Sequence, residues 1–390
     1  MKHKLCSIHT TPNTNLVNRS KKAKARSSTA EDHVDDAVAK QAITKSGIKP
    51  IAKQTVPLKR EVVGKPEISS GGDNAKTRKA ARQKSKDYHD QFSTKRMEYA
   101  TKWKMSSNSL QHFEALLGHG FHTKKILASD VEARKKFSNL AIDGMIEARK
   151  DNQKNDNCRS FFITIVDDAG ITLDREPEFD LHKFQTRIRN YIQRDLKLNA
   201  FGVIEVQAVT NHPQKGEGRY LLFHCHLIAW TYDPDFDPKE AMKTKNFSSK
   251  LSVKPVVIKK ITDTEGDIAH LGHYLTKSPL YGKRRVPCEK SPTGYKFKPS
   301  KAGMRPELCL RVSEVLSHFT IRDLVFAIGE GAEIRKDIFT KLTAWHRKRD
   351  KSTLVETLVS TERLWERLRC DNGSKLFQPP KLIIKRPSRC

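Results

Sequence analysis

The fold of this chain is decided by two neighbouring stretches of its sequence, AFGVIEVQAV (residues 200–209) and RYLLFHCHLIAW (residues 219–230). Both are rich in β-branched and aromatic residues, and the turn-rich segment TNHPQKGEG separates them, so they predict a long β-hairpin. The second strand contains two histidines, His224 and His226. Because side chains at i and i+2 point to the same face of a strand, the two imidazoles project side by side.

Strands and helices alternate on both sides of this hairpin. The stretch RSFFITIVDD (residues 159–168) predicts a strand, and an amphipathic helical segment follows it. After the hairpin, VKPVVIKKI (residues 253–261) predicts another strand, and DTEGDIAHLGHYLTKS (residues 263–278) predicts a helix that begins at Asp263 or Thr264. This order of elements indicates an α+β fold with a central, mainly antiparallel sheet flanked by helices.

The composition changes along the chain and divides it into six parts. The first part is basic and contains hardly an aromatic residue, so it buries too little apolar area to offset its ordering entropy. We expect it to act as a solubilising tail or as a tether for phosphates. The predicted parts are a disordered basic arm (residues 1–85), a helical accessory segment (86–153), the α+β core (154–280), a basic loop (281–303), a helical C-terminal region (304–370) and a basic tail (371–390).

The net charge of the chain is +29, from 74 Lys and Arg against 45 Asp and Glu. An excess of this size favours a polyanionic partner, either nucleic acid or an anionic membrane surface. The sequence has no apolar run near the length that a membrane span needs, and no long basic amphipathic helix with a bulky apolar face. We therefore expect nucleic acid, and no membrane, as the partner.

The cysteines and the N-terminal residues bear on the compartment. The seven cysteines are scattered and odd in number, and no C-x-x-C spacing occurs. The first residues, MKHKLCSIHTTPNTN, include basic side chains without an apolar stretch behind them, which predicts no secretory signal. These features are typical of a reduced protein without a zinc knuckle, and we expect a cytoplasmic location.

The hairpin register predicts a third ligand beside the two histidines. If the turn is centred near residues 214 and 215, Glu205 lies opposite His224 and shares the histidine face. Two imidazoles and one carboxylate form a reasonable site for a divalent cation, with positions left open for a substrate oxygen. A different register would bring Gln207 or His212 to the site instead. The structural alternative is a pair of core histidines beside an exposed carboxylate.

The helix predicted at residues 263–278 carries two stripes on opposite sides. One is aliphatic (Ile268, Leu271, Leu275), and the other consists of His270, His273, Tyr274 and Lys277. If the aliphatic stripe packs on the sheet, Tyr274 and Lys277 are presented together, one turn apart. Tyrosine can attack as a nucleophile and form a covalent intermediate, but with a pKa of about 10 it needs a nearby positive charge. The alternative is an ordinary amphipathic surface helix.

In combination, these stretches resemble the signature of the HUH endonucleases, and in particular the single-tyrosine initiators of rolling-circle replication in plasmids and phages. The resemblance rests on SFFITIV, then FHCHLIAW, then AHLGHYLTK, and covers residues 155–280. It implies a Rep-like core of the ferredoxin/RRM type, with Mg²⁺ or Mn²⁺ held by His224 and His226. It also implies that Tyr274 attacks a phosphate of single-stranded DNA to give a 5′-phosphotyrosine, while Lys277 orients the tyrosine or balances charge.

The resemblance also indicates partners. It implies single-stranded DNA at a replication origin, and the sequence contains no phosphate-binding loop of a helicase, so a host helicase is the expected second partner. The rival hypotheses are a DNA-binding replication accessory or repressor that no longer cuts, and a basic structural RNA-binding protein. The candidate DNA-binding residues are Lys283, Arg284, Arg285, Lys296 and Lys298.

Overall fold

The computed structural model describes most of the chain from Thr77 onward. The described residues are 77–102, 110, 113–114, 117, 125–152, 157–211, 218–251, 254–262, 264–279, 281–290, 294–300, 304–349, 366 and 380–384.

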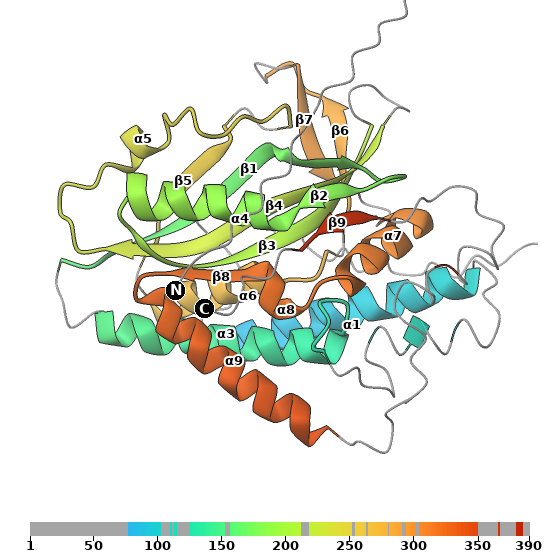
Figure 1. Ribbon diagram of the computed structural model, residues 1–390, viewed down its shortest axis with the longest axis horizontal. Coiled ribbons are helices and arrows are strands. Elements are labelled where there is room, and N and C mark those ends of the chain that lie inside the picture. Colours follow the sequence, from blue (N-terminus) through green and yellow to red (C-terminus); the bar gives the residue numbers. More distant parts are fainter. Residues whose placement is uncertain are drawn as a thin grey trace, which may run out of the picture. The chain divides into compact units, whose positions relative to one another are not determined.

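The strands form one large sheet and one small one (Figure 1). In the seven-stranded sheet the order is β5-β1-β4-β3-β6-β7, and β8 also pairs with β3; in the small sheet, β2 pairs in parallel with β9. Only the short β3–β6 pairing of the large sheet is parallel, so the predicted α+β class with a mainly antiparallel sheet is confirmed. The strands are β1 (Arg159–Leu173), β2 (Glu178–Asp180), β3 (Asn199–Thr210), β4 (Arg219–Thr231), β5 (Val256–Lys260), β6 (Lys283–Pro287), β7 (Tyr295–Pro299), β8 (Val325–Ile328) and β9 (Lys381–Ile383).

Helices precede, interrupt and follow the sheet in the sequence. They are α1 (Arg78–Lys102), α3 (Val131–Asn152), α4 (Leu181–Asn190) with the π-helical turn η1 (Tyr191–Asp195), α5 (Pro238–Ala241), α6 (Glu265–Thr276), α7 (Pro306–Ser317), α8 (Ile321–Leu324) and α9 (Gly331–Lys348). Within the described part of the chain, no helix combines the length and the apolar character needed to cross a bilayer.

The hairpin of β3 and β4 lies in the middle of the large sheet, and β1 pairs with the other edge of β4. All residues of β4 from Leu221 to Thr231 are buried, so both faces of this strand are covered. Alternation along the strand places His224 and His226 on one face and Phe223 and Cys225 on the other. This double coverage explains why the strand is almost uninterruptedly apolar.

Different elements cover the two faces of β4. On one face, the ring of Phe179 in β2 stacks on Phe223 with centroids 3.7 Å apart, and Phe184 of α4 packs edge-on against Phe179. On the opposite face, Tyr274 of α6 packs edge-on against His226, with centroids 5.0 Å apart. The histidine pair therefore faces α6.

Helix α6 lies between the sheet and α3, and its orientation differs from the prediction. A Cβ at Gly272 would lie 3.1 Å from the Cα of Ile142, so α6 and α3 are in close contact on that side. Tyr274 and Lys277 point toward the sheet, so the prediction that their stripe faces away from it was wrong. The reason is that the sheet presents a polar His/Glu face here. Gly272 lies four residues after Ile268 and three before Leu275, so the side of α6 that meets α3 is the side of the aliphatic stripe.

Helix α1 corrects the boundary of the predicted basic arm (residues 1–85), because it begins at Arg78. Ala81 is fully buried, and the hydroxyls of Ser85 and Ser138 in α3 are hydrogen-bonded at 2.5 Å. The local composition predicted that this segment buries too little apolar area to fold. Its contacts with α3, a distant segment, offset the entropy cost of ordering it. The rest of the predicted arm lies outside the described residues.

The segment predicted as a basic loop, residues 281–303, contains strands β6 and β7. These strands pair antiparallel, and the guanidinium of Arg285 lies 3.8 Å from the centroid of the Tyr295 ring. The sequence YKFK alternates aromatic and basic residues with the period of a strand, which explains why this segment forms a β-ribbon and not a loop. Strand β8, inside the predicted helical C-terminal region, was also missed, and β9 lies in the predicted basic tail.

Candidate metal and tyrosine site

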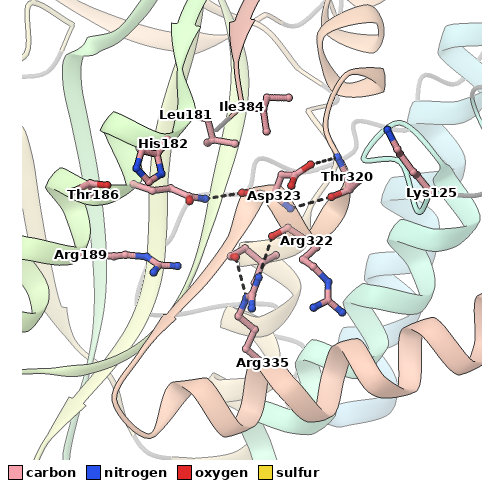
Figure 2. Close-up of a pocket in the computed structure, with 12 residues that line it drawn as sticks. Lys125, Leu181, His182, Thr186, Arg189, Thr320, Arg322, Asp323, Arg335 and Ile384 are labelled. Atoms are coloured by element: carbon pink, nitrogen blue, oxygen red, sulfur yellow. Dashed lines mark hydrogen bonds between the residues drawn. The ribbon is translucent and has the colours of Figure 1, made fainter. Parts of the chain in front are cut away.

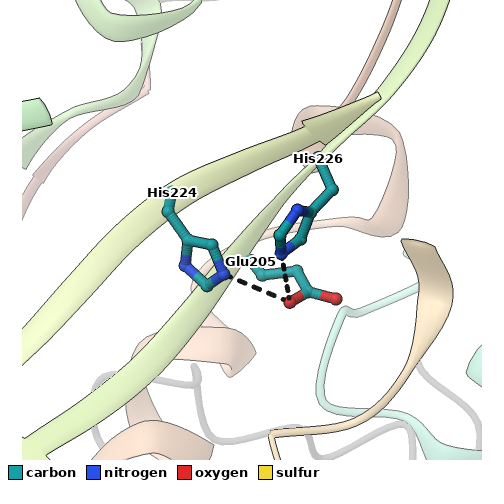
Figure 3. Close-up of side chains that lie close together, drawn as sticks. All are labelled: Glu205, His224 and His226. Carbon is teal, nitrogen blue, oxygen red and sulfur yellow. Dashed lines mark ion pairs between the residues drawn. The ribbon is translucent and has the colours of Figure 1, made fainter. Parts of the chain in front are cut away.

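Glu205, His224 and His226 form a buried group on the face of the sheet that α6 covers (Figure 3). The predicted hairpin register is confirmed, since Glu205 is the cross-strand partner of His224. Oε2 of Glu205 is 3.4 Å from Nε2 of His224 and 3.6 Å from Nε2 of His226. Gln207 pairs with Leu222 one step further along, and His212 lies outside the described residues.

Hydrogen bonds to the other ring nitrogens fix both imidazoles. Nδ1 of His226 is 2.9 Å from the hydroxyl of Thr164 on β1, and Nδ1 of His224 lies 3.4 Å from the carbonyl oxygen of Leu222. In the tautomer in which Nδ1 carries the proton, each ring donates from Nδ1 and directs the lone pair of Nε2 toward Glu205. Metal-binding histidines are typically oriented in this way.

The donor atoms of the group fit a divalent cation. Oε1 of Glu205 and Nε2 of His226 are buried without a hydrogen-bond partner, which is costly unless a ligand satisfies them. The three donor atoms lie within 4.8 Å of one another. Neighbouring ligand atoms of an octahedral cation with bonds of about 2.1 Å are about 3 Å apart, so a small contraction closes the site. The group can therefore hold a metal ion.

Tyr274 and Lys277 of the α6 segment lie beside this group. The Tyr274 ring packs edge-on against Phe162 and against His226, with centroid distances of 5.5 Å and 5.0 Å. Nζ of Lys277 is 3.4 Å from the centroid of the Tyr274 ring and 3.6 Å from Oε2 of Glu205. One ammonium group thus bridges the tyrosine and the carboxylate that belongs to the candidate metal site.

The charges of the group favour the protonation states that bind a cation. Burial lowers the pKa of His224 and His226, so both imidazoles are neutral near pH 7. Burial raises the pKa of Glu205, but Lys277 and His224 outweigh it, and the net shift is downward. Burial lowers the pKa of Lys277, but Glu205 and Tyr274 outweigh it and raise the pKa above its ordinary value. At neutral pH the site therefore contains one carboxylate, two neutral rings and one ammonium.

Arg134 of α3 is a component of the site that the sequence reasoning missed. Its guanidinium donates hydrogen bonds to the carbonyl oxygens of Lys277 (2.9 Å) and Ala128 (3.2 Å), and so holds the C-terminal end of α6. Arg134 follows Val131 and precedes Phe137 by three residues, which places a cation on the apolar stripe of α3. A cation at an apolar position of a helix was the sequence feature that could have indicated this role.

Two aromatic residues extend the site from other elements. Tyr88 of α1 packs edge-on against Tyr281, with centroids 6.2 Å apart, and against the buried His273 of α6 at 6.0 Å. Burial raises the pKa of Tyr88 well above its ordinary value, so its hydroxyl stays protonated near neutral pH. Tyr88, Tyr281 and His273 therefore form an aromatic cluster, and Tyr88 is close enough to Tyr274 for the two hydroxyl groups to interact electrostatically.

The predicted DNA-binding residues all lie on the β6–β7 ribbon. Lys283 is half-buried, and burial and the neighbouring Lys277 lower its pKa to about 8. Arg284, Lys296 and Lys298 are exposed, and their alternation along the two paired strands places them on one face of the ribbon. The ribbon therefore extends positive charge from the Tyr274 site to its own surface.

Comparisons with models of protein families, with curated proteins and with solved structures found no match to this chain.

Proposed function

We propose that this chain is a metal-dependent DNA nicking and joining endonuclease of the HUH type, which initiates rolling-circle replication. The observation that supports this most is that one buried His-His-Glu group, one tyrosine and one lysine meet in a single site. They come from the β3–β4 hairpin and from the α6 segment, which begins more than 30 residues after the hairpin ends. In this proposal the sheet and α6 form a Rep-like core of the ferredoxin/RRM type, and the protein works in the cytoplasm.

His224, His226 and Glu205 would hold Mg²⁺ or Mn²⁺. When bound, such a cation polarises a phosphate oxygen and offsets the negative charge that develops during its substitution. Imidazole and carboxylate are ligands that a divalent cation of this kind accepts. The chain itself supplies the fixed ring orientation through Thr164 and Leu222.

Tyr274 would be the nucleophile. Its phenol oxygen forms a bond to the phosphorus of single-stranded DNA, the bond from phosphorus to the 3′ oxygen breaks, and the phenol proton ends on that leaving oxygen as a free 3′-hydroxyl. The product is a 5′-phosphotyrosine, and the reverse reaction rejoins a strand. Lys277 holds a positive charge beside the ring and orients it.

The β6–β7 ribbon would guide the single strand of a replication origin to Tyr274. Its exposed Arg284, Lys296 and Lys298 supply phosphate contacts, and such contacts position a strand without reading its sequence. We propose that a host helicase opens the duplex.

The proposal is tested by incubating the chain with labelled circular single-stranded DNA and Mn²⁺ and separating the products on a denaturing gel. We expect labelled DNA that migrates with the protein and disappears with EDTA. Tyr274→Phe removes one hydroxyl and should abolish this band. Strong DNA binding without any covalent band would favour the rival hypothesis, a DNA-binding accessory or repressor that does not cut.

A further inference from the structure

A pocket lies beside α4 and shares no residue with the His-His-Glu group (Figure 2). Its volume is about 500 Å³, within the range of small-molecule sites. Helix α4 forms one wall, α8 and β8 form another, and Arg335 of α9 and Ile384 close it. The pocket therefore gathers segments that are far apart in the sequence.

Positive side chains dominate the pocket. Arg189, Arg322 and Arg335 line it from α4, α8 and α9, and Figure 2 shows their guanidinium groups below Asp323. The pocket also contains Lys125 and His182. Among the described residues that line the pocket, Asp323 is the one acidic residue, so the charge balance strongly favours an anionic ligand.

The carboxylate of Asp323 stabilises the start of α8. It accepts a hydrogen bond from the backbone N–H of Thr320 (2.8 Å) in the capping box that begins α8. Among the residues that the structure describes, no carboxylate lies within ion-pair distance of Arg189, Arg322 or Arg335. The three guanidinium groups thus form no ion pair within the described part of the chain, although the charge of Asp323 raises the pKa of Arg335 and partly offsets the effects that lower it.

The arginines are held in place by neutral contacts. Arg335 donates hydrogen bonds to the carbonyl oxygens of Val325 (3.1 Å) and Arg322 (3.3 Å). The guanidinium of Arg322 lies 4.7 Å from the ring centroid of Phe339, and that of Arg189 lies 6.0 Å from Phe326. Burial, together with Arg322 and Arg189, lowers the pKa of Arg335 to about 10. Like charges are therefore kept close together despite their mutual repulsion.

An arrangement of this kind is suited to phosphate. Guanidinium groups bind phosphate oxygens through pairs of parallel hydrogen bonds, and a ligand with several negative oxygens relieves the repulsion among them. The hydroxyl of Thr186 and the apolar side chains of Leu181 and Val325 line the same pocket and can receive the less polar part of such a ligand.

We propose that this pocket binds a ligand with at least two phosphate groups through Arg189, Arg322 and Arg335. Two sources share this chemistry: a free nucleotide with a di- or triphosphate, and successive phosphates of a nucleic-acid strand. The proposal concerns a different surface from the Tyr274 site and does not depend on the proposed nicking reaction.

The test uses the full chain in buffer with EDTA, so that no cation-dependent reaction occurs. Binding of inorganic pyrophosphate and of ADP is measured by calorimetry, and binding of a short single-stranded oligonucleotide by fluorescence anisotropy. The test variant is Arg189→Ala/Arg322→Ala, since neither side chain donates to the backbone of the described residues. The matched control is Arg194→Ala, which removes an exposed arginine outside the pocket lining.

We expect the double variant to lose affinity for pyrophosphate and ADP by about tenfold or more, because charge-assisted hydrogen bonds are removed, while Arg194→Ala has little effect. If the double variant loses affinity only for the oligonucleotide, the ligand is a nucleic-acid strand and not a free nucleotide. Thr186→Glu places a carboxylate in the pocket from an exposed helical position. It should weaken binding of whichever probe the double variant fails to bind, without truncating an arginine. Equal binding of every probe by the wild type and both pocket variants would overturn the proposal.

Discussion

Lys277 contacts Tyr274 and Glu205 at the same time: its Nζ is 3.4 Å from the centroid of the tyrosine ring and 3.6 Å from the carboxylate. The proposed nucleophile and the proposed metal ligand are thus linked through one ammonium group. This relationship means that changes at Lys277 should affect cation binding and strand cleavage in opposite directions.

Replacing Lys277 with Met should strengthen Mn²⁺ binding and weaken cleavage. Removing a positive charge about 4 Å from a dication is worth about 2 kcal/mol even with the screening of water, which corresponds to about thirtyfold in affinity. Lys277→Arg keeps the charge and serves as the control. Titration calorimetry with Mn²⁺ checks the first effect and a nicking assay the second; weaker Mn²⁺ binding by Lys277→Met would contradict this account.

His226→Ala or Glu205→Gln should remove high-affinity Mn²⁺ binding. Each change deletes or neutralises one of the three donors found among the described residues, so we expect affinity for Mn²⁺ to fall by at least about 100-fold, the upper end of what changes in outer partners cost. His182→Ala, an exposed histidine on α4, is the matched control. Single-stranded DNA should still bind all variants, because phosphate contacts supply most of the affinity. Unchanged Mn²⁺ affinity in both site variants would show that the group is structural.

Changing the exposed basic residues of the β6–β7 ribbon should weaken DNA binding and its salt dependence. Each lost phosphate contact reduces the slope of log K against log salt by about 0.7 on single-stranded DNA. For three contacts we expect a decrease of about 2, measured by anisotropy over a series of salt concentrations. The ribbon variant replaces Arg284, Lys296 and Lys298 with Ala, and the control replaces the exposed Lys239, Lys245 and Lys260. Equal slopes for both variants would exclude the ribbon as the DNA-binding surface.

Removing residues 1–76 should leave folding and nicking intact and weaken DNA binding mainly at higher salt. Removing residues 1–90 should destabilise the protein, because it deletes the buried Ala81 and His89; the ring of His89 is hydrogen-bonded to Ser278 just after α6. Thermal unfolding of the two truncations distinguishes the two cases. Equal melting temperatures would show that α1 does not support the core.

The sequence alone predicted those features that depend on local alternation. The register of Glu205 against His224 follows from strand period and turn position, and Thr264 is the N-cap of α6, one of the two predicted starts. The strands β1, β3, β4 and β5 were predicted from another local feature, since each contains a run of apolar, β-branched residues.

Features that depend on distant partners were not predictable in this way. The predicted direction of Tyr274 was wrong because α6 is covered on two sides, by the sheet and by α3. The sequence of α6 does not show which of the two its aliphatic side faces. Arg134 was missed because its role is to bind carbonyl oxygens of a segment far along the chain. Residues 78–85 were assigned to the arm because nothing local shows that α3 covers them.

The most direct test of the central claim is to identify the residue that carries DNA after reaction. The protein is incubated with single-stranded DNA and Mn²⁺, digested with protease and nuclease, and its peptides are mapped by mass spectrometry. We expect the nucleotide on Tyr274, which α6 holds against His226, and an unaltered yield of adduct with Tyr281→Phe. A nucleotide on Tyr281, or a full yield of adduct with Tyr274→Phe, would contradict the account.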